Sequence, residues 1–480
     1  MKRVKGVKGA SFHFVILSLF VYLLLPVSCG NRSPNLSEKQ LQALTNDSVQ
    51  KKTEVLADTS YMPTAGVKHT EIRSVDPTNP PAIIDIAGNQ ENKKAFKISD
   101  FASSVSYIYL QQPPDTKFTS ISEVVSDDKH IFINTSIGLL YYSEDGRYLY
   151  TLCTNELETS DLGTRIVNGM KSGANIDLFN DRLFFRTTHW SSLDEGASDI
   201  RLNVFDIKEL DAQSPFIMQS GELPQPTYQR RLDPSKDSGL LSRYLLMDDL
   251  SYFISNSLTC VAIKGDTLCK FNDYDRPSTF EKVGIKPAIY RINGRVMLRM
   301  SYSDTIFRIV PPNRLIPAYV MQWGQYKPDI NQYAGGSDLE GKLVLRDWIE
   351  TSRYIFIEYT EGRAYPARWM QGKVKFYYAI YDKTTKTLFH HITSTQPPMQ
   401  EVKMGTMLTS IPLPPMLEND IEPVGMPFWP SGLNHKDEIY MIFSKEQIKS
   451  YIATGKFRND KLQSIYDTMP DDGFCLMTVK

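Results

Sequence analysis

The sequence predicts an all-β fold, a six-bladed β-propeller with a short helical insertion in the last blade. Short apolar runs separated by turn residues recur throughout residues 96–480, and they group into six units. Aromatic residues make up 11% of the chain, which suits pleated strands. A unit of about four strands is too small to bury both of its faces alone, so we expect the six sheets to pack around a common centre. A pair of packed sheets is the alternative, and it would need fewer and longer strands.

The first unit, in residues 121–152, shows this pattern most clearly. A turn at Asp127-Asp128, a second turn, and a third at Glu144-Asp145-Gly146 separate its apolar runs. The third turn resembles the Asp box of sialidases, but its Gly comes one residue early and Tyr replaces Trp. Asp and Gly both tolerate the backbone of a tight turn, so the segment predicts a hairpin that builds architecture. The four runs are "EVVS", "HIFIN", "LLYYS" and "YLYTL".

Five further units repeat the pattern at irregular intervals, and each predicts one blade. In chain order, the units contain "IDLFNDRLFFRT" with "IRLNVFDI", "LSYFIS" with "TCVAIKGDTLCKF", "AIYRINGRVMLRMSYSDTIFRIV" with "NRLIPAYVMQWG", "RDWIETSRYIFIEYTE" with "KFYYAIYDKTTKTLFHHI", and "GMPFWPSGLNHKDEIYMIFS" with "DGFCLMTV".

The two ends of the propeller are predicted to meet in its last blade. The run "VSYIYLQQ", which starts at Val105, precedes the first unit, and we expect it to pair with the last sheet. The last unit is interrupted by "SKEQIKSYIATGKF", where Ser444 and Gln447 form a capping-box pattern and Gly455 suits a helix end. We therefore expect a short helix there, after which the final "CLMTV" returns to the sheet.

Residues 1–28 have the parts of a bacterial secretion signal. Four basic residues come first, and the apolar run Phe14–Leu25 follows, which is too short to span a bilayer comfortably. The segment "LPVSC" resembles a lipoprotein cleavage site, with Pro26 where Leu is usual. The resemblance implies that Cys29 becomes the lipidated first residue of the mature chain and anchors it in the outer membrane. An ordinary cleaved signal peptide with a free Cys29 is the alternative.

Residues 29–95 are predicted to form a polar, flexible tether between Cys29 and the propeller of residues 96–480. Apolar residues are sparse up to about Ala82, and no strand alternation persists. Residues 30–33 carry no acidic side chain, whereas surface-exported lipoproteins of Bacteroidetes typically place acidic residues directly after the Cys. This favours the periplasmic face of the outer membrane over the cell surface.

The charge balance argues against nucleic acid as a partner. The formal net charge is −1, and removing residues 1–28 with their four basic residues leaves about −5. A slightly acidic chain lacks the basic footprint of nucleic-acid binding. The expected partners are the membrane, through the lipid anchor, and a protein or glycan ligand.

The order and spacing of several segments resemble the six-bladed β-propeller lipoproteins of Bacteroidetes. The resemblance covers roughly residues 95–480 and implies the fold and the location, while it leaves the activity open. The Gly-rich stretch that usually follows the first blade is replaced here by "CTNELETSDLGTRIVNG". Beside the lipoprotein signal, the resemblance rests on "VSYIYLQQPPDT", "DDKHIFIN", "YYSEDGRYLYTL", "SDTIFRIVPPNRLIPAYVMQWG", "SRYIFIEY" and "YYAIYDKTTKTL".

Four cysteines remain beside Cys29, and two of them are placed to meet. No CxxC motif occurs and no His stands at metal-ligand spacing beside a Cys, so we expect no metal site and no cofactor. In "CVAIKGDTLC", a two-residue turn would set Cys260 opposite Cys269, whereas a three-residue bulged turn would point the thiols to opposite faces. A disulfide and two buried free thiols both stay open. The other two cysteines are Cys153 and Cys475.

Two unusual loops, "EGRAYPARWMQG" and "MPFWPSGLNH", hold the candidate ligand-binding residues. Aromatic and Arg side chains favour binding sites, because they stack on sugars or anchor a partner. Packing at a blade junction is the alternative reading. The candidates are Arg363, Tyr365, Arg368, Trp369, Phe428 and Trp429.

The sequence contains no GxSxG, HExxH, P-loop or dinucleotide-binding motif. We therefore expect a binding or interaction module of the cell envelope, and we assign no catalytic residue. The alternative is a propeller hydrolase, lactonase-like or glycan-cleaving. Such an enzyme would need titratable side chains from several blades to converge on the central channel.

Overall fold

The computed structural model describes one compact unit, which lies within residues 62–480. Cys29 and residues 1–67 lie outside the described residues. The described residues are 68–159, 166–191, 198–232, 243–248, 251–255, 257–272, 288–300, 303–329, 332, 339–363, 368, 374–392, 399–404, 407–412, 416–422, 425–434, 436–453 and 460–480.

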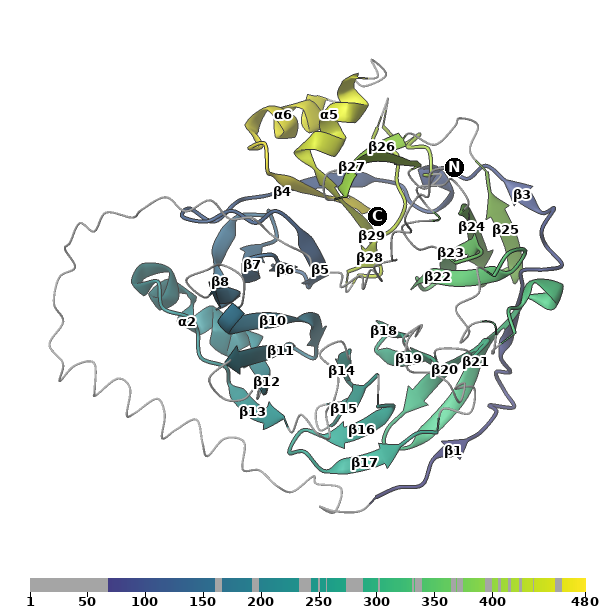
Figure 1. Cartoon of the computed structure of the whole chain (residues 1–480), viewed down its shortest axis with the longest axis horizontal. Helices are drawn as coiled ribbons and strands as arrows, with labels where there is room; N and C mark the ends of the chain where they lie inside the picture. Colours follow the sequence, from purple (N-terminus) through teal and green to yellow (C-terminus); the bar gives the residue numbers. More distant parts are fainter. Residues whose placement is uncertain are drawn as a thin grey trace, which may run out of the picture. The chain divides into compact units, whose positions relative to one another are not determined.

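Six antiparallel sheets form the six blades, and Figure 1 shows them arranged around a common centre. The strands β5, β10, β14, β18, β22 and β28 lie nearest that centre. Blade 1 consists of β5 (Ile121–Ser126), β6 (His130–Thr135), β7 (Gly138–Ser143) and β8 (Tyr148–Thr154). Blade 2 consists of β9 (Glu156–Thr159), β10 (Ile166–Phe179), β11 (Arg182–Ser191), β12 (Ser198–Asp206) and β13 (Tyr228–Leu232). Blade 3 consists of β14 (Tyr244–Leu246), β15 (Ser251–Ile254), β16 (Thr259–Ala262) and β17 (Thr267–Lys270).

Blades 4 to 6 complete the ring, and the predicted propeller is confirmed, with each of the six predicted units forming one blade. Blade 4 consists of β18 (Ala288–Ile292), β19 (Arg295–Arg299), β20 (Thr305–Val310) and β21 (Arg314–Gln322). Blade 5 consists of β22 (Leu343–Glu350), β23 (Tyr354–Glu361), β24 (Lys375–Asp382) and β25 (Thr387–His391). Blade 6 consists of β28 (Gly432–Leu433), β29 (Ile439–Ser444), β30 (Phe474–Val479) and β4 (Val105–Leu110).

The hydrophobic core is divided into six clusters, one at each junction between neighbouring blades. At the junction of blades 4 and 5, for example, Met297 and Ile306 pack with Ile357 and Tyr381. The strand β6 is buried along its whole length because both of its faces meet a neighbouring blade or strand layer. Each blade therefore depends on its neighbours for burial, as expected for a repeat fold.

The ring closes as predicted, because β4 pairs with β30 and completes blade 6. The turn between β7 and β8 in blade 1 secures this closure. The N–H of Gln111, which follows β4, donates to the carbonyl of Gly146 at 2.9 Å. Gly146 has a φ of 85°, and a Cβ there would lie 2.2 Å from the backbone oxygen of Tyr109. The segment that resembles an Asp box is thus a structural turn.

The predicted helical insertion in the last blade is confirmed, and it consists of two helices, α5 (Lys445–Ala453) and α6 (Asp460–Thr468). The capping box is present, because Gln447 N–H donates to Ser444 Oγ and the side chain of Gln447 accepts from Ser444 N–H. A further helix, α2 (Ile207–Ser220), lies in blade 2 and was not predicted. Asp206 caps its start, and Gly221 ends it in the left-handed conformation.

The segment of residues 72–101, here called the strap, runs along the outer strands of blades 4 and 5 before it enters blade 6 (Figure 1). It contains β1 (Ile72–Arg73) and β2 (Ala82–Asp85), which pair in parallel with β21. It also contains β3 (Lys93–Lys94), which pairs in parallel with β25, and the 3₁₀ turn η2 (Ile98–Asp100). The strap covers sheet edges that would otherwise stay open.

The strap corrects the prediction of a flexible tether for the part of it between residues 72 and 95. Ile84 and Ile86 are fully buried in the cluster between blades 4 and 5, so this part belongs to the folded body. The few apolar residues of "AIIDIAG" are enough to fix the segment, because they fall on a ready-made strand edge. The remainder of the predicted tether, residues 29–67, lies outside the described residues.

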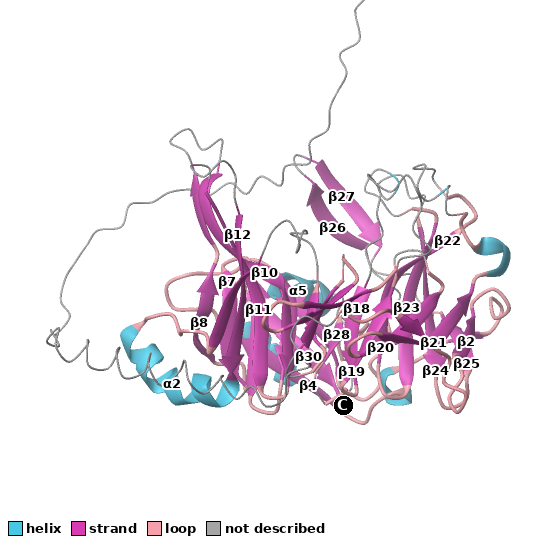
Figure 2. Ribbon diagram, turned by 90° about the horizontal axis from the view of Figure 1, so that it is seen from below, coloured by secondary structure: helices cyan, strands magenta, loops and turns pink. Residues whose placement is uncertain are grey.

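Seen from the side, the outer ends of the long strands of blade 2 and the hairpin of β26 (Met399–Met404) and β27 (Met407–Pro412) lie toward one face (Figure 2). Helix α2 lies toward the other face (Figure 2). A short 3₁₀ turn, η3 (Gly324–Tyr326), follows β21. Among the residues that the structure describes, no helix has both the length and the apolar character needed to cross a membrane.

Candidate functional site

Two of the predicted ligand-binding residues, Phe428 and Trp429, prove to be core residues. Phe428 is fully buried, and Trp429 is 7% exposed, in the cluster between blades 5 and 6. The Trp429 ring packs edge-on against Tyr378 and Phe356, with centroid distances of 4.7 Å and 5.7 Å. This corrects the prediction that they bind a ligand, because packing at a blade junction explains both.

The other loop is only partly described. Arg363 is half-buried, and its Nη2 donates to the carbonyl of Gln332 at 3.2 Å. Arg368 is 7% exposed, so its guanidinium is buried within the protein. The ligand-binding roles of Arg363 and Arg368 stay predictions. Tyr365 and Trp369 lie outside the described residues, and their assignment stays a prediction.

Cys260 and Cys269 face each other as Cα partners, and both are buried free thiols. The turn between them is the three-residue form, in which Ala262 N–H donates to the carbonyl of Asp266 and Gly265 has a φ of 109°. A bulge next to Cys260 then restores the register that this turn shifts. Burial raises the pKa of Cys260 to about 12 and that of Cys269 to about 11.

The adjacent histidines at the end of β25 point to opposite junctions, as strand geometry requires. His390 Nδ1 lies 2.8 Å from the Tyr359 hydroxyl, toward blade 4. His391 Nδ1 accepts the N–H of Phe96 at 3.2 Å, toward blade 6. Burial lowers the pKa of His390 to about 4, so it is neutral at physiological pH. Both rings serve packing.

The innermost strands carry buried charges that connect neighbouring blades. Asp177 on β10 accepts hydrogen bonds from Arg291 Nη2 on β18, at 2.7 Å, and from the N–H of Leu246 on β14, at 2.8 Å. Glu123 on β5 accepts the N–H of Ile176 at 3.1 Å, and burial raises the pKa of its carboxyl. In the described part of the chain, no group of three or more His, Cys, Asp or Glu residues is arranged to hold a metal ion.

Glu350, at the end of β22, is the most heavily bonded of these inner carboxylates. It is 3% exposed and accepts the hydroxyls of Tyr290 and Tyr319 from blade 4, at 2.7 Å and 2.5 Å. Lys383 Nζ lies 2.9 Å from its Oε1 and also donates to the carbonyl of Thr351 at 2.9 Å. Burial, followed by the Glu350 charge, raises the pKa of both tyrosines. This network joins blades 4 and 5.

An open cleft of about 280 Å³ lies beside this network, between blades 4 and 5. Its volume is close to the lower end of the roughly 300–1,000 Å³ that is usual for small-ligand sites. The strap forms one wall, and the strands and turns of the two blades form the others. The residues that line it are Asp76, Asn79, Pro80, Ala82, Ile292, Asn293, Arg295, Met297, Arg308, Ile316, Pro317, Ala318, Tyr319, Glu350, Tyr381, Lys383 and Lys386.

The cleft is rich in positive charge that the protein does not neutralise. Lys383 is paired with Glu350. The side chains of Arg295, Arg308 and Lys386, by contrast, make no hydrogen bond or ion pair with any residue that the structure describes. The Nε of Arg308 is moreover buried without a partner in the described part of the chain. Buried donors without an acceptor are rare in native proteins and need an explanation.

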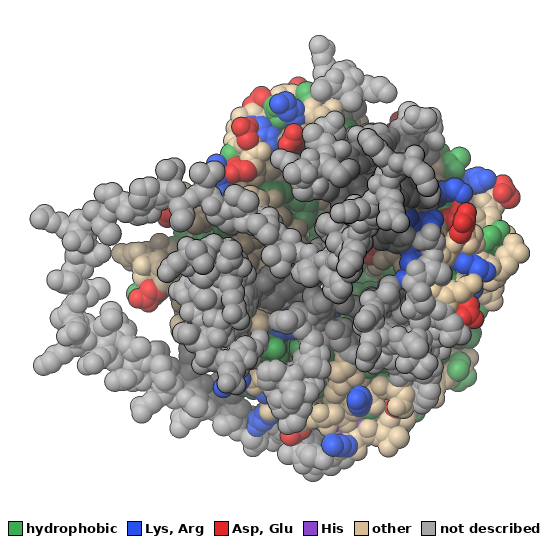
Figure 3. Space-filling view, viewed as in Figure 1, with side chains coloured by type: hydrophobic (Ala, Val, Ile, Leu, Met, Phe, Trp, Pro, Cys, Tyr) green, Lys and Arg blue, Asp and Glu red, His purple; other side chains and the backbone are tan. Residues whose placement is uncertain are grey.

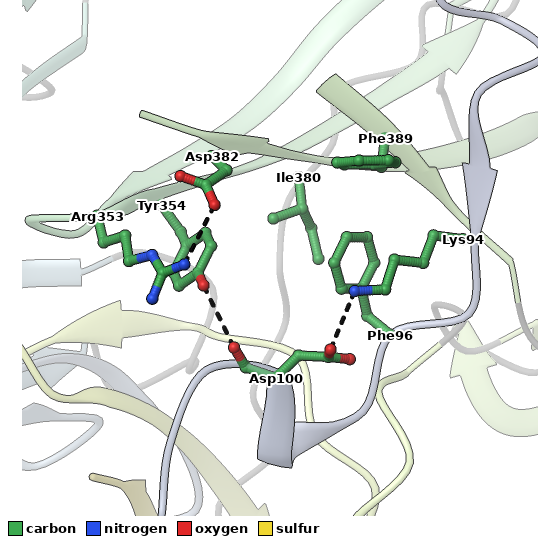
Figure 4. Close-up of a pocket in the computed structure, with 8 residues that line it drawn as sticks. All are labelled: Lys94, Phe96, Asp100, Arg353, Tyr354, Ile380, Asp382 and Phe389. Atoms are coloured by element: carbon green, nitrogen blue, oxygen red, sulfur yellow. Dashed lines mark hydrogen bonds and ion pairs between the residues drawn. The ribbon is translucent and has the colours of Figure 1, made fainter. Parts of the chain in front are cut away.

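A second, smaller cavity of about 190 Å³ lies between the strap and the outer part of blade 5 (Figure 4). Its charges are already paired: Lys94 Nζ lies 3.0 Å from Asp100, and Arg353 Nη2 lies 3.4 Å from Asp382. The Tyr354 hydroxyl donates to the carbonyl of Asp100 at 3.3 Å (Figure 4). Because these groups satisfy one another, this cavity is the weaker candidate for a binding site.

Charged side chains of both signs lie on the described part of the face drawn in Figure 3. Lys and Arg side chains are mixed with Asp and Glu side chains along its right side. Salt bridges account for part of the mixture, as between Lys93 and Glu91 at 2.9 Å.

The sequence matches the model of the family described as "Domain of unknown function (DUF4933)" over residues 64–454. The chain belongs to this family. The matched region includes the strap, blades 1 to 5 and all of blade 6 except β30, so the DUF4933 domain of this chain covers most of the propeller. No curated protein matches the sequence.

Three solved structures are reported as similar to this DUF4933 protein, and the first of them shares its fold. A Bacteroides fragilis structure described as an exported protein is 13% identical, with a TM-score of 0.51, and the match covers 83% of this chain and 99% of that one. The extracellular domain of a two-component system protein from B. thetaiotaomicron is 12% identical, with a TM-score of 0.30, over 70% and 38% of the chains. The phage phi92 endosialidase is 9% identical, with a TM-score of 0.40, over 79% and 69%.

Sequence reasoning did not find the cleft, although one signal for it exists. Arg308 stands inside the otherwise apolar strand "TIFRIV", and charged residues are rarely buried unless they have a partner or a function. The other cleft residues come from the strap, from strand ends and from turns. Only the packing of blade 4 against blade 5 brings them together, so their spacing in the sequence carries no pattern.

Proposed function

We propose that this DUF4933 protein is a lipid-anchored binding module of the cell envelope, which holds its ligand in the cleft between blades 4 and 5. The cleft carries the proposal, because it combines an open volume of about 280 Å³ with unpaired Arg295, Arg308 and Lys386. Clefts with apolar walls and a few convergent polar groups are the usual form of ligand sites.

The proposed location rests on the sequence and on one relative in fold. The basic and apolar segments before Cys29 have the form of a lipoprotein signal. The similar Bacteroides fragilis protein is described as exported. Lipid on Cys29 would attach the chain to the outer membrane, with the periplasmic face favoured. The propeller's partner would be a glycan or a protein, because the slightly acidic balance of the sequence argues against nucleic acid.

The chemistry of the inner strands favours binding over the alternative of a propeller hydrolase. Asp177 and Glu350 are each held by a cation and by further donors, and these contacts tie blades together. A catalytic carboxylate needs instead to face a substrate and exchange a proton. The contacts of the two carboxylates therefore support a structural role for them. In the proposed binding module, the cleft is the functional site.

A glycan array probed with the full-length protein tests this proposal. Asn79→Trp would fill the mouth of the cleft from the exposed strap without disturbing the core. Lys264→Trp, in an exposed turn of blade 3, is the matched control. We expect the wild type and Lys264→Trp to bind the same glycans and Asn79→Trp to lose them. Retained binding by Asn79→Trp would refute the cleft as the site.

A further inference from the structure

We propose that the ligand of the cleft between blades 4 and 5 is a small organic oxyanion, recognised by Arg295 and Arg308. This inference rests on the proposed function and names the chemical class of its ligand. A carboxylate or phosphate offers the acceptor geometry that matches the donors of a guanidinium, so the two arginines point to such a group.

The charge of the cleft sets the expected charge of the ligand. Glu350 and Lys383 neutralise each other at 2.9 Å. Three unpaired cations then face one remaining carboxylate, that of Asp76. The resulting excess of two positive charges suits a ligand with one or two negative charges.

Arg295 and Arg308 differ from several other arginines of the described residues. Arg291 is bonded to Asp177 at 2.7 Å, and Arg346 is bonded to Glu358 at 3.0 Å. Arg308 departs from this pattern, although its Nε is buried. A bound oxyanion would supply the acceptor that this donor lacks among the described residues.

The walls of the cleft indicate that the anion has an organic body. Apolar side chains and aromatic rings form much of the lining, and two amides stand among them. The Tyr319 hydroxyl is already committed to Glu350, so this residue offers its ring rather than a donor. Rings and amides together suit a sugar, which has an apolar face and a hydroxylated edge. The residues concerned are Ile292, Met297, Tyr319, Tyr381, Asn79 and Asn293.

Asp76 on the strap modulates the site in this account. Its carboxylate accepts the N–H and the hydroxyl of Thr78, at 3.0 Å and 2.7 Å. These bonds lower the pKa of Asp76, and the charge of Arg308 contributes to the same shift. Asp76 therefore stays ionised near Arg308 and competes with an incoming anion. Removing its charge should strengthen anion binding.

Calorimetry on the full-length protein at low ionic strength tests the inference. The probes are glucuronate, glucose 6-phosphate, inorganic phosphate and uncharged glucose. We expect one or both charged sugars to bind and glucose not to bind, and the better of the two identifies the oxyanion. Arg295→Gln and Arg308→Gln should each weaken binding about tenfold or more, because hydrogen bonds to charged groups contribute about 1.5–3 kcal/mol. Asp76→Asn should strengthen it.

Arg314→Gln is the matched control, because Arg314 is an exposed arginine of the same blade that does not line the cleft. It should bind like the wild type, and far-UV circular dichroism verifies that every variant is folded. Inorganic phosphate that binds as tightly as the sugars would contradict an organic ligand. No binding of any anion would overturn the inference.

The two proposals fail in distinguishable ways. Neutral glycans that bind in a manner sensitive to Asn79→Trp but not to Arg308→Gln would overturn the oxyanion and leave the binding module intact. Anion binding that survives Asn79→Trp would show that the cleft is not the binding site, and it would refute both proposals.

Discussion

The ammonium group of Lys383 lies 2.9 Å from Oε1 of Glu350, and this contact completes a network that joins blades 4 and 5. The carboxylate is 3% exposed, so it depends on its partners in place of water. Removing the cation while leaving the buried carboxylate should be strongly destabilising.

Lys383→Met should therefore lower the free energy of unfolding by about 2–3 kcal/mol, somewhat below the usual cost for a fully buried pair because the Lys383 side chain is 22% exposed. Urea denaturation followed by circular dichroism measures this change. Lys386→Met, in the same turn but exposed and unpaired among the described residues, should change it by less than about 0.5 kcal/mol. Equal stability of the two variants would contradict the account of the network.

A second network predicts a pH-dependent contribution to stability. The imidazole of His130 lies 2.7 Å from the carboxylate of Asp127 and 3.3 Å from that of Asp211. Asp211 lies in helix α2, and its carboxylate also accepts a hydrogen bond from the Tyr141 hydroxyl at 2.8 Å. Burial opposes the charge on His130, but the bonds and charges of Asp127 and Asp211 outweigh it and raise the pKa of His130. Burial of Asp127 is likewise outweighed by its bonds to His130 and Lys129, which lower its pKa.

The sign of the effect follows from these directions. A raised His pKa gives stability that is fully present below the unfolded-state value of about 6.5 and is lost as the pH rises through the folded-state value. The lowered Asp127 pKa gives stability above about 3.9, lost as the pH falls. Thermal denaturation of wild type and His130→Gln should thus differ most between about pH 4 and 6.5. A difference in melting temperature between the two proteins that does not shrink toward pH 8.5 would show that the charge of the imidazole plays no part.

Ring closure depends on the absence of a side chain at residue 146. Gly146→Ala combines the strain of a φ of 85° with a Cβ 2.2 Å from the Tyr109 oxygen. Gly221→Ala is the matched control, because Gly221 has a similar φ of 70° but open space around its Cβ position. The control should lose about 1–2 kcal/mol from backbone strain alone. Gly146→Ala should lose clearly more in urea denaturation, and an equal loss would mean that the close approach is relieved without cost.

The cysteines give a direct chemical prediction. Cys153, Cys260, Cys269 and Cys475 are buried free thiols. In the native protein, a thiol reagent at pH 8 should label none of them, because all four are buried, and burial also raises the pKa of Cys260, Cys269 and Cys475. In urea without reductant, all four should react. Only two reactive thiols in urea would show that Cys260 and Cys269 are bonded, the arrangement that their Cα pairing also permits.

The lipid anchor is a prediction of the sequence alone. Replacing Cys29 with Ser removes the thiol that would carry the lipid, so the protein should leave the membrane fraction and lose incorporation of labelled palmitate. The wild-type protein should fractionate with the membrane and incorporate labelled palmitate. A Cys29→Ser protein that still fractionates with the outer membrane would show that another part of the chain provides the attachment.

The architecture was largely readable from the sequence because it depends on local patterns. Strand alternation, turn residues and the Ser444–Gln447 capping box each act over a few residues, and together they fixed the six blades and the ring closure. Helix α2 was missed because Pro215 lies inside it and interrupts the pattern. The strap was missed because Ile84 and Ile86 gain their burial from a distant sheet edge.

The functional site was less predictable for the same physical reason. Aromatic residues drew attention to Phe428 and Trp429, yet the side chains of a propeller blade are buried at both junctions, so aromatic content mainly marks packing. The cleft instead combines Asp76, Arg308 and Lys386 from three distant segments. Their convergence follows from the order of the blades, which single-sequence patterns do not specify.

Hydrogen exchange of the full-length protein, with and without the anion found by calorimetry, tests the central claim most directly. We predict slower exchange at the amides of Asp76, Asn79 and Ala82 in the strap and of Lys383 and Lys386 in the β24–β25 turn, because these residues line the cleft. Slower exchange only around Lys94 and Arg353, in the cavity of Figure 4, would place the ligand in the other site and contradict the account.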